Sequence, residues 1–220
     1  MKKTIMNTKY IWLLVILLGF TACNDIEDVL SDNNIDTTIE ELPALTAGSV
    51  DFSKFVAIGA SFTAGYSDGA LFKAAQTNSF PNILAQQFAL IDGGTFTQPL
   101  TSDNFGGLAA AGNRIPGFGP RLVFGGAGPV SLESLIGPVT VGTDILVNTP
   151  TGPFTNMGVP GAKSYHLLFN GYGNPANLAT QTANPYFIRM ASSTSATMLG
   201  DAMVQNPTFF TLSEIGGNDV

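Results

Sequence analysis

Three short segments carry the residues of this sequence whose types and spacing could do chemistry. Ser61 follows the apolar residues 55–58, Gly161 ends a second glycine-containing segment, and Asn218 follows the apolar residues 209–212. A serine hydroxyl acts as a nucleophile in acyl transfer. Backbone N–H groups in glycine turns and an asparagine amide can stabilise the oxyanion that forms in that reaction. The combination predicts an acyl-transfer site.

Each of these segments also has a purely structural interpretation, which stays open at this point. Serine is a favoured N-cap, so Ser61 fits the start of a helix. Gly158 and Gly161 fit ordinary turn glycines, and Asn218 and Asp219 fit a helix cap. Because the three segments occur together, the chemical interpretation is favoured over three independent structural roles.

The order of these segments resembles that of the SGNH/GDSL hydrolase family, also called GDSL-like lipases and acylhydrolases. The residues that carry the resemblance are Gly59-Ala60-Ser61-Phe62, Asn156-x-Gly158-x-Pro160-Gly161 and Gly216-Gly217-Asn218-Asp219. The resemblance covers roughly residues 52–220. It implies that Ser61 is the nucleophile and that the Gly161 N–H, the Asn218 side chain and the Ser61 N–H form the oxyanion hole.

The resemblance also implies the fold and the activity. The implied fold is α/β, a three-layer flavodoxin-like SGNH hydrolase fold in which Ser61, Gly161 and Asn218 meet at the carboxyl edge of a parallel sheet. The implied activity is that of a serine ester hydrolase, a lipase, esterase or acyl- or acetyl-esterase, which works through an acyl-serine intermediate without cofactor or metal. The implied substrate is a small-molecule, lipid or glycan ester.

Two departures from the family pattern bear on activity. Ala60 stands where the family commonly has Asp, and no Asp-x-x-His block, which carries the family's general base, occurs before Val220. We therefore expect a sheet that is incomplete at its C-terminal side, an exposed strand edge, and a weak or inactive catalyst in this truncated chain. The alternative is a non-catalytic, surface-anchored binding lipoprotein or an inactive fragment.

His166 is the single histidine and therefore the one candidate for a substitute base. A general base must lie within roughly 2.6–3.2 Å of the hydroxyl that it activates. Residues 162–168 are predicted to form the helix after the second segment, and this helix would carry the His166 ring away from the Gly161 turn. A surface or packing role is the default expectation, and a catalytic role is the alternative.

Residues 1–22 have the pattern of a lipoprotein signal peptide. Three lysines precede the apolar residues 11–20, a run too short to span a membrane comfortably. The sequence Phe20-Thr21-Ala22-Cys23 resembles a bacterial lipobox, which implies that Cys23 is lipidated and begins the mature protein. An ordinary secretory signal with an incidental thiol is the alternative.

Residues 23–50 are predicted to be an acidic flexible tether. Dense like charge with few aromatic residues favours a solvated chain over a folded one. Its acidic residues are Asp25, Glu27, Asp28, Asp32, Asp36, Glu40 and Glu41. With Cys23, this stretch resembles surface lipoproteins of Bacteroidetes type. The resemblance implies a lipid anchor in the bacterial outer membrane as the contact with a membrane, and it leaves cell-surface exposure open.

The composition is compatible with one SGNH hydrolase-like domain over residues 51–220. Charged residues make up 11% of the chain against 45% hydrophobic residues, and the 25 glycines and 13 prolines favour turns and extended loops. The net charge of −7 and the lack of a basic patch argue against a nucleic-acid partner. One histidine and one cysteine cannot form a transition-metal cluster, and no glycine motif for nucleotide binding occurs.

Apolar spacing predicts two helices and leaves a long insertion between the first two segments. One helix begins after Ser79 and continues to about residue 91, and the other runs from about Ser195 to the residue before Asn206. Residues 92–153 are a Gly- and Pro-rich insertion with two open interpretations. It either covers the Ser61 cleft, with Phe105, Phe118 and Phe124 as apolar contacts, or it is a structural insertion with strands at residues 122–124 and 139–141.

Overall fold

The computed structural model describes residues 43–220, of which residues 45–220 form one compact unit. The predicted signal peptide, Cys23 and the tether up to residue 42 lie outside the described residues. Within the described part of the chain, no helix is both long and apolar enough to cross a bilayer.

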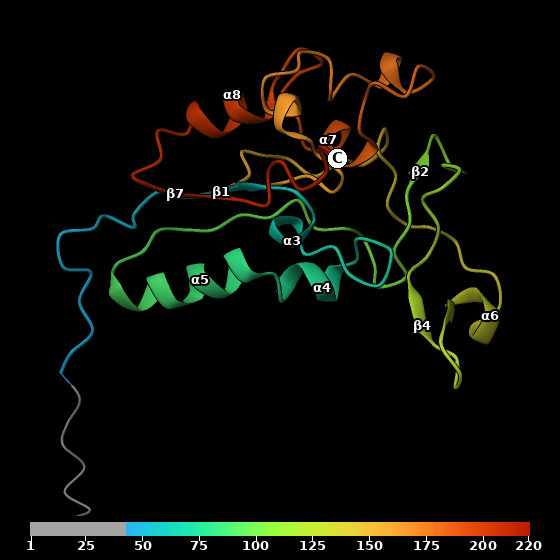
Figure 1. The fold of residues 1–220 in the computed structure, drawn as a ribbon, viewed down its shortest axis with the longest axis horizontal. Helices are drawn as coiled ribbons and strands as arrows, with labels where there is room; N and C mark the ends of the chain where they lie inside the picture. Colours follow the sequence, from blue (N-terminus) through green and yellow to red (C-terminus); the bar gives the residue numbers. More distant parts are fainter. Residues whose placement is uncertain (1–42) are drawn as a thin grey trace, which may run out of the picture. The chain divides into compact units, whose positions relative to one another are not determined.

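The described unit alternates short strands with short helices (Figure 1). The strands are β1 (Phe55–Gly59), β2 (Ala109–Ala110), β3 (Asn113–Arg114), β4 (Leu122–Phe124), β5 (Pro129–Ser131), β6 (Asn156–Gly158) and β7 (Phe209–Ser213). The α-helices are α3 (Ser61–Ala64), α4 (Lys73–Thr77), α5 (Phe80–Phe88), α6 (Glu133–Ile136), α7 (Pro185–Ile188) and α8 (Met198–Met203). The 3₁₀ segments are η2 (Ala89–Ile91), η3 (Ser164–Leu167) and η4 (Pro175–Asn177).

A three-stranded parallel sheet in the order β6-β1-β7 lies at the centre. All five residues of β1 are buried, as expected for the central strand of a sheet that is covered on both faces. The mixed α/β class with a parallel sheet is therefore confirmed.

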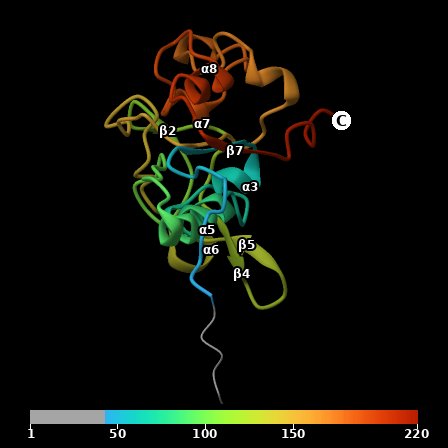
Figure 2. The ribbon, with the colours of Figure 1, turned by 90° about the vertical axis from the view of Figure 1, so that its left-hand side faces the viewer.

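Successive side chains of β1 point to opposite faces of the sheet, because a strand has a period of two. Val56 and Ile58 belong to the larger core cluster together with Met198 of α8, and Phe55 and Ala57 pack on the other face with residues of α5. Two perpendicular views show α8 and α5 on opposite sides of the sheet (Figures 1 and 2). Helices thus cover both faces of the central strand.

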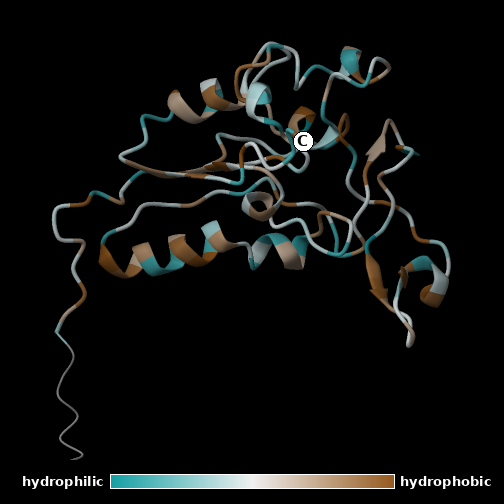
Figure 3. Ribbon diagram, viewed as in Figure 1, coloured by the Kyte–Doolittle hydropathy of each residue, from teal (hydrophilic) through white to brown (hydrophobic). Residues whose placement is uncertain are grey.

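The core beneath α5 is rich in aromatic side chains. Its rings come from Phe52, Phe55, Phe88, Phe96 and Phe209, and their centroids are 4.1–5.8 Å apart in stacked, tilted and edge-on pairs. The spacing is that of favourable aromatic pairs. Figure 3 shows apolar and polar residues alternating along α5, which is the pattern of a helix with one buried face.

Both predicted helices are present, with differences in extent. α5 followed by η2 covers residues 80–91 as expected, whereas α8 begins at Met198, three residues later than Ser195. The side chain of Thr197 accepts a hydrogen bond from the Gly200 N–H at 3.0 Å, so the helix is capped at Thr197. The earlier residues are therefore outside the helix.

The insertion holds two small antiparallel hairpins, β2-β3 and β4-β5, and the single turn of α6. The strand predicted at residues 122–124 is confirmed as β4, but the strand predicted at residues 139–141 is wrong. The Val139 N–H donates to Glu133 Oε1 at 2.9 Å, and the Val139 carbonyl accepts from Arg114 Nη2 at 2.9 Å. Because side chains satisfy this backbone, it does not pair with a strand.

β7 lies at one edge of the described sheet and has an exposed side. Phe210 and Leu212 are 58% and 56% exposed, although their partners in register, Val56 and Ile58, are buried. Side chains of the same register in parallel strands lie on the same face. The α8 face of the sheet is thus covered over β1 and open over β7.

Candidate functional site

The three segments singled out in the sequence leave the sheet at one edge and at one level. Gly59, the last residue of β1, is in register with Gly158 at the end of β6 and with Ser213 at the end of β7. The chain after each of these residues leads into the turns that contain Ser61, Gly161 and Asn218, respectively. Carboxyl edges of parallel sheets are the usual place for ligand sites.

Two glycines allow α3 to pack directly on the strand ends. A Cβ atom at Gly158 would contact the backbone N of Ala64, and one at Gly59 would contact the Thr63 side chain and lie 2.7 Å from the Ser213 carbonyl oxygen. No side chain fits at either position without moving the helix. The glycines at the ends of β1 and β6 are therefore needed for the close approach of α3.

Ser61 is the first residue of α3, and the interpretation of Ser61 as the N-cap is wrong. The N-cap is Ala60, and its helix has no side-chain cap. The half-buried Ser61 side chain makes no hydrogen bond to the rest of the described chain. Its hydroxyl is thus not used to hold the turn.

Glu214 caps the turn instead. Its Oε1 accepts hydrogen bonds from the N–H groups of Ala60 and Thr63 at 2.8 and 2.9 Å, and from the Thr63 hydroxyl at 2.8 Å. Its Oε2 accepts from the Phe62 N–H at 2.8 Å. The Ser61 N–H is the one amide of residues 60–63 that donates to no acceptor in the described part of the chain.

Gly161 presents a second free amide. Its φ of +77° lies in the left-handed region, and a Cβ built on it would meet nothing within 4 Å, so the residue borders open space. The neighbouring amides are engaged: Val159 N–H donates to the Gly59 carbonyl and Ala162 N–H to the Val159 carbonyl, both at 3.0 Å. The Gly161 N–H has no such partner among residues 43–220.

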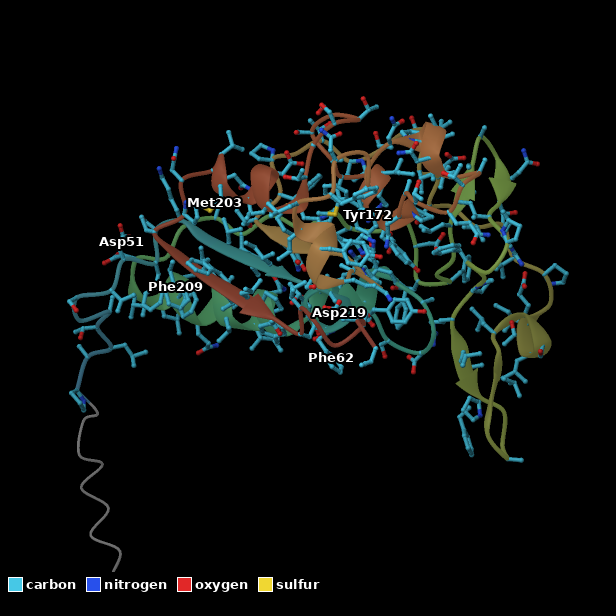
Figure 4. All side chains as sticks on the ribbon, turned by 45° about the horizontal axis from the view of Figure 1, so that its top comes forward. Asp51, Phe62, Tyr172, Met203, Phe209 and Asp219 are labelled. Atoms are coloured by element: carbon cyan, nitrogen blue, oxygen red, sulfur yellow. The ribbon has the colours of Figure 1, made fainter. Side chains whose placement is uncertain are left out.

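Asn218 is joined to the segment that contains Gly161. Its Nδ2 donates to the Ala162 carbonyl at 2.9 Å, which uses one of the two amide hydrogens. Asp219 Oδ1 accepts from the Ser164 N–H at 2.8 Å, and hydrogen bonds from Ser164 lower the pKa of the Asp219 carboxyl. Asp219 thus holds the first residue of η3 from a distant part of the chain, and the N-cap of η3 is Lys163. Figure 4 shows Asp219 and Phe62 beyond the arrowhead of β7.

A cavity of about 520 Å³ borders Gly161. Its walls include Ile115, Pro116 and Phe118 from the insertion, together with Tyr172. Phe118 thus borders the cavity next to Gly161, whereas Ser61 and Asn218 are not among the residues that line it. The other two aromatic residues expected in the cover do not line this cavity, since Phe124 is 74% exposed on β4 and Phe105 is 38% exposed.

His166 lines the same cavity as Gly161, so the prediction that a helix carries its ring away from this turn is wrong. The segment forms one 3₁₀ turn instead of an α-helix, and the His166 ring stacks on Tyr172 with centroids 4.0 Å apart. Nδ1 accepts from the Lys163 N–H at 3.0 Å, so a neutral ring carries its proton on Nε2. Burial, followed by the nearby Lys163 charge, lowers the pKa of His166.

The structure thus joins the turns that hold Ser61, Gly161 and Asn218, and it adds Glu214, which the sequence analysis missed. None of the hydrogen bonds of His166 within the described residues reaches Ser61. No group of three or more His, Cys, Asp or Glu side chains able to hold a metal ion occurs among the described residues. Comparisons with models of protein families, with curated proteins and with solved structures returned no match.

Proposed function

We propose that the protein is a serine ester hydrolase with an SGNH/GDSL-like, flavodoxin-like domain, acting through an acyl-serine intermediate. The observation that carries this proposal is the pattern of free donors. The Ser61 N–H, the Gly161 N–H and one Asn218 amide hydrogen have no acceptor within the described residues, although the amides around them do. Free donors at one sheet edge are what stabilisation of a tetrahedral oxyanion requires.

In this proposal the Ser61 Oγ attacks the ester carbonyl, and the carbonyl oxygen becomes an oxyanion held by the three donors. Collapse of this intermediate breaks the C–O bond to the alcohol, which leaves with the proton that the Ser61 hydroxyl gave up, and the acyl group stays on Ser61. Water then adds to the acyl carbon and releases the acid and the free Ser61 hydroxyl. The cavity between Phe118 and Tyr172 receives the acyl or the alcohol part of the ester. The apolar part of its wall, which includes Ile115, Phe118 and Leu178, favours a hydrophobic group there.

The substrate in this proposal is a small-molecule, lipid or glycan ester, and the enzyme is anchored at the bacterial outer membrane through a lipid on Cys23. The support for the anchor is the lipobox-like sequence alone. Metabolic labelling with palmitate tests it: the label should be present in the wild type and absent from Cys23→Ser. Label that persists in the variant would remove the anchor from the proposal.

A second candidate is a binding lipoprotein that keeps the cavity without the chemistry. The observation in its favour is that the Ser61 hydroxyl has no hydrogen-bonded base within the described residues. A serine needs a base to become a good nucleophile at neutral pH. The two candidates therefore differ in whether Ser61 is reactive.

A fluorophosphonate probe distinguishes the two candidates. The ester hydrolase should be labelled, Ser61→Ala should not, and Ser67→Ala, which changes an exposed serine in the following turn, should label like the wild type. Asn218→Ala should slow labelling by about 10²–10³-fold if its amide stabilises the oxyanion. Absence of labelling in the folded wild type would favour the binding protein.

A further inference from the structure

We propose that Glu214 is the positioning residue of this site, which orders the Ser61 turn and leaves the Ser61 N–H free for the substrate. This inference rests on the proposed function, because it assigns Glu214 a role in presenting the nucleophile. Four donors converge on one carboxylate at 2.8–2.9 Å, and all four belong to residues 60–63. No other side chain in the described structure accepts a hydrogen bond from these residues.

The charge of Glu214 matters because it is balanced by hydrogen bonds rather than by a cation. The ion pair present among the described residues joins Arg114 to Glu133, and Glu214 takes no part in one. Hydrogen bonds to a charged acceptor are shorter and stronger than those between neutral groups. The carboxylate therefore holds the N–H groups of Ala60, Phe62 and Thr63 and the Thr63 hydroxyl in fixed directions without a competing cation.

The backbone of Glu214 adds a second observation. Its φ is +52°, a left-handed conformation that residues other than glycine, asparagine and aspartate seldom adopt. The left-handed conformation costs free energy in an L-residue that carries a Cβ atom. A glycine at this position would avoid that cost, so the side chain of Glu214 is what offsets it.

The pattern of acceptors has a direct consequence for Ser61. The amides on either side of it, at Ala60 and Phe62, point to the two oxygens of Glu214. The Ser61 N–H lies between them and donates to neither. Glu214 thus separates one amide from its neighbours and keeps it available, in the place where the proposed oxyanion needs a donor.

Two substitutions at Glu214 test the inference. Glu214→Gly removes the carboxylate while it suits the left-handed backbone, so any loss reports on the side chain and not on strain. Glu214→Gln keeps one acceptor oxygen but presents an NH₂ group to the other amide. In the orientation that keeps the acceptor for Ala60 and Thr63, the Phe62 N–H faces a donor and loses its partner.

Fluorophosphonate labelling of Ser61 gives the first readout. We expect Glu214→Gly to label about 100-fold more slowly than the wild type, because a displacement of about 1 Å at a reacting group has an effect of that size. Sodium formate should restore a large part of the rate in Glu214→Gly, since formate supplies the missing carboxylate, and sodium chloride at the same ionic strength should not. Met198→Ala, which destabilises the core on α8, should label normally below its melting temperature.

Amide hydrogen exchange gives a second readout that does not need a reactive serine. Protection of the Phe62 amide should fall in Glu214→Gln and protection of the Ala60, Phe62 and Thr63 amides should fall in Glu214→Gly. If Ser61 is labelled as fast in Glu214→Gly as in the wild type, the inference is wrong. If the wild type itself is not labelled, the proposed function fails, and amide exchange then decides about Glu214: unchanged protection of residues 60–63 overturns its role, and lost protection supports it.

Discussion

Gly158→Ala is expected to displace α3 and thereby impair both stability and the reactivity of Ser61. A Cβ at position 158 would contact the Ala64 backbone N and lie 2.6 Å from the Thr63 carbonyl carbon. Backbone atoms cannot rotate away as the end of a flexible side chain can. α3 is also tied to the same strand, because Asn156 Nδ2 donates to the Thr63 carbonyl at 2.9 Å. The added methyl group must therefore push the helix from the sheet.

The magnitude follows from the cost of overpacking a close-packed contact, about 1–3 kcal/mol of unfolding free energy. For a domain of this size each kcal/mol lowers the melting temperature by about 2–4 °C, so we expect a decrease of about 2–12 °C. Urea unfolding measures the free energy, and fluorophosphonate labelling at a temperature where both proteins are folded measures the position of Ser61.

Gly128→Ala is the matched control. Gly128 lies at the tip of the β4-β5 hairpin, and a Cβ there would meet nothing within 4 Å. Its unfolding free energy should stay within about 0.5 kcal/mol of the wild type. If Gly158→Ala were equally stable and equally reactive, the close approach of α3 to β6 would not be what places Ser61.

Three further predictions concern a histidine, a threonine and a pair of exposed side chains on β7. Since burial lowers the pKa of His166 below its ordinary value of 6.5, the unfolded chain binds a proton more readily, so the melting temperature should fall as the pH drops below 6.5. His166→Asn, which can still accept from the Lys163 N–H, should flatten the curve in that window, and an unchanged curve would contradict the assignment. Thr63→Val should lower the unfolding free energy by about 1.5–3 kcal/mol in urea titrations, because a hydroxyl bond to a carboxylate is lost, and a change below about 0.5 kcal/mol would show that this bond contributes little. Phe210→Glu combined with Leu212→Lys should reduce self-association in sedimentation velocity while thermal stability stays the same, because both side chains are more than half exposed on an edge strand.

The sequence was sufficient for elements whose stability is decided by local pattern. The sequence alone shows the apolar run of β1, the helical spacing of the apolar residues in α5, and the glycines that end β1 and β6. Predicting these elements required only the side-chain periods of strands and helices and the small size of glycine.

The missed features depend on contacts between residues far apart in the chain. Glu214 is a surface-type residue by composition, and only the register of β7 on β1 brings its carboxylate to the turn at residue 60. Arg189 is expected at the surface, yet it is 2% exposed and donates to the carbonyls of Pro99 and Leu100. The His166 ring was misplaced because stacking on Tyr172 is a tertiary contact.

The link between Glu214 and the first turn also sets an order of events during synthesis. The Ala60 amide and its acceptor on Glu214 are 154 residues apart in the chain, so the acceptor is translated long after the serine. Domains emerge from the ribosome with the N-terminal part first. Until β7 has been made and has docked, the Glu214 carboxylate cannot accept from the amides around Ser61. The growing polypeptide therefore acquires an ordered Ser61 turn only after residue 214 has been translated.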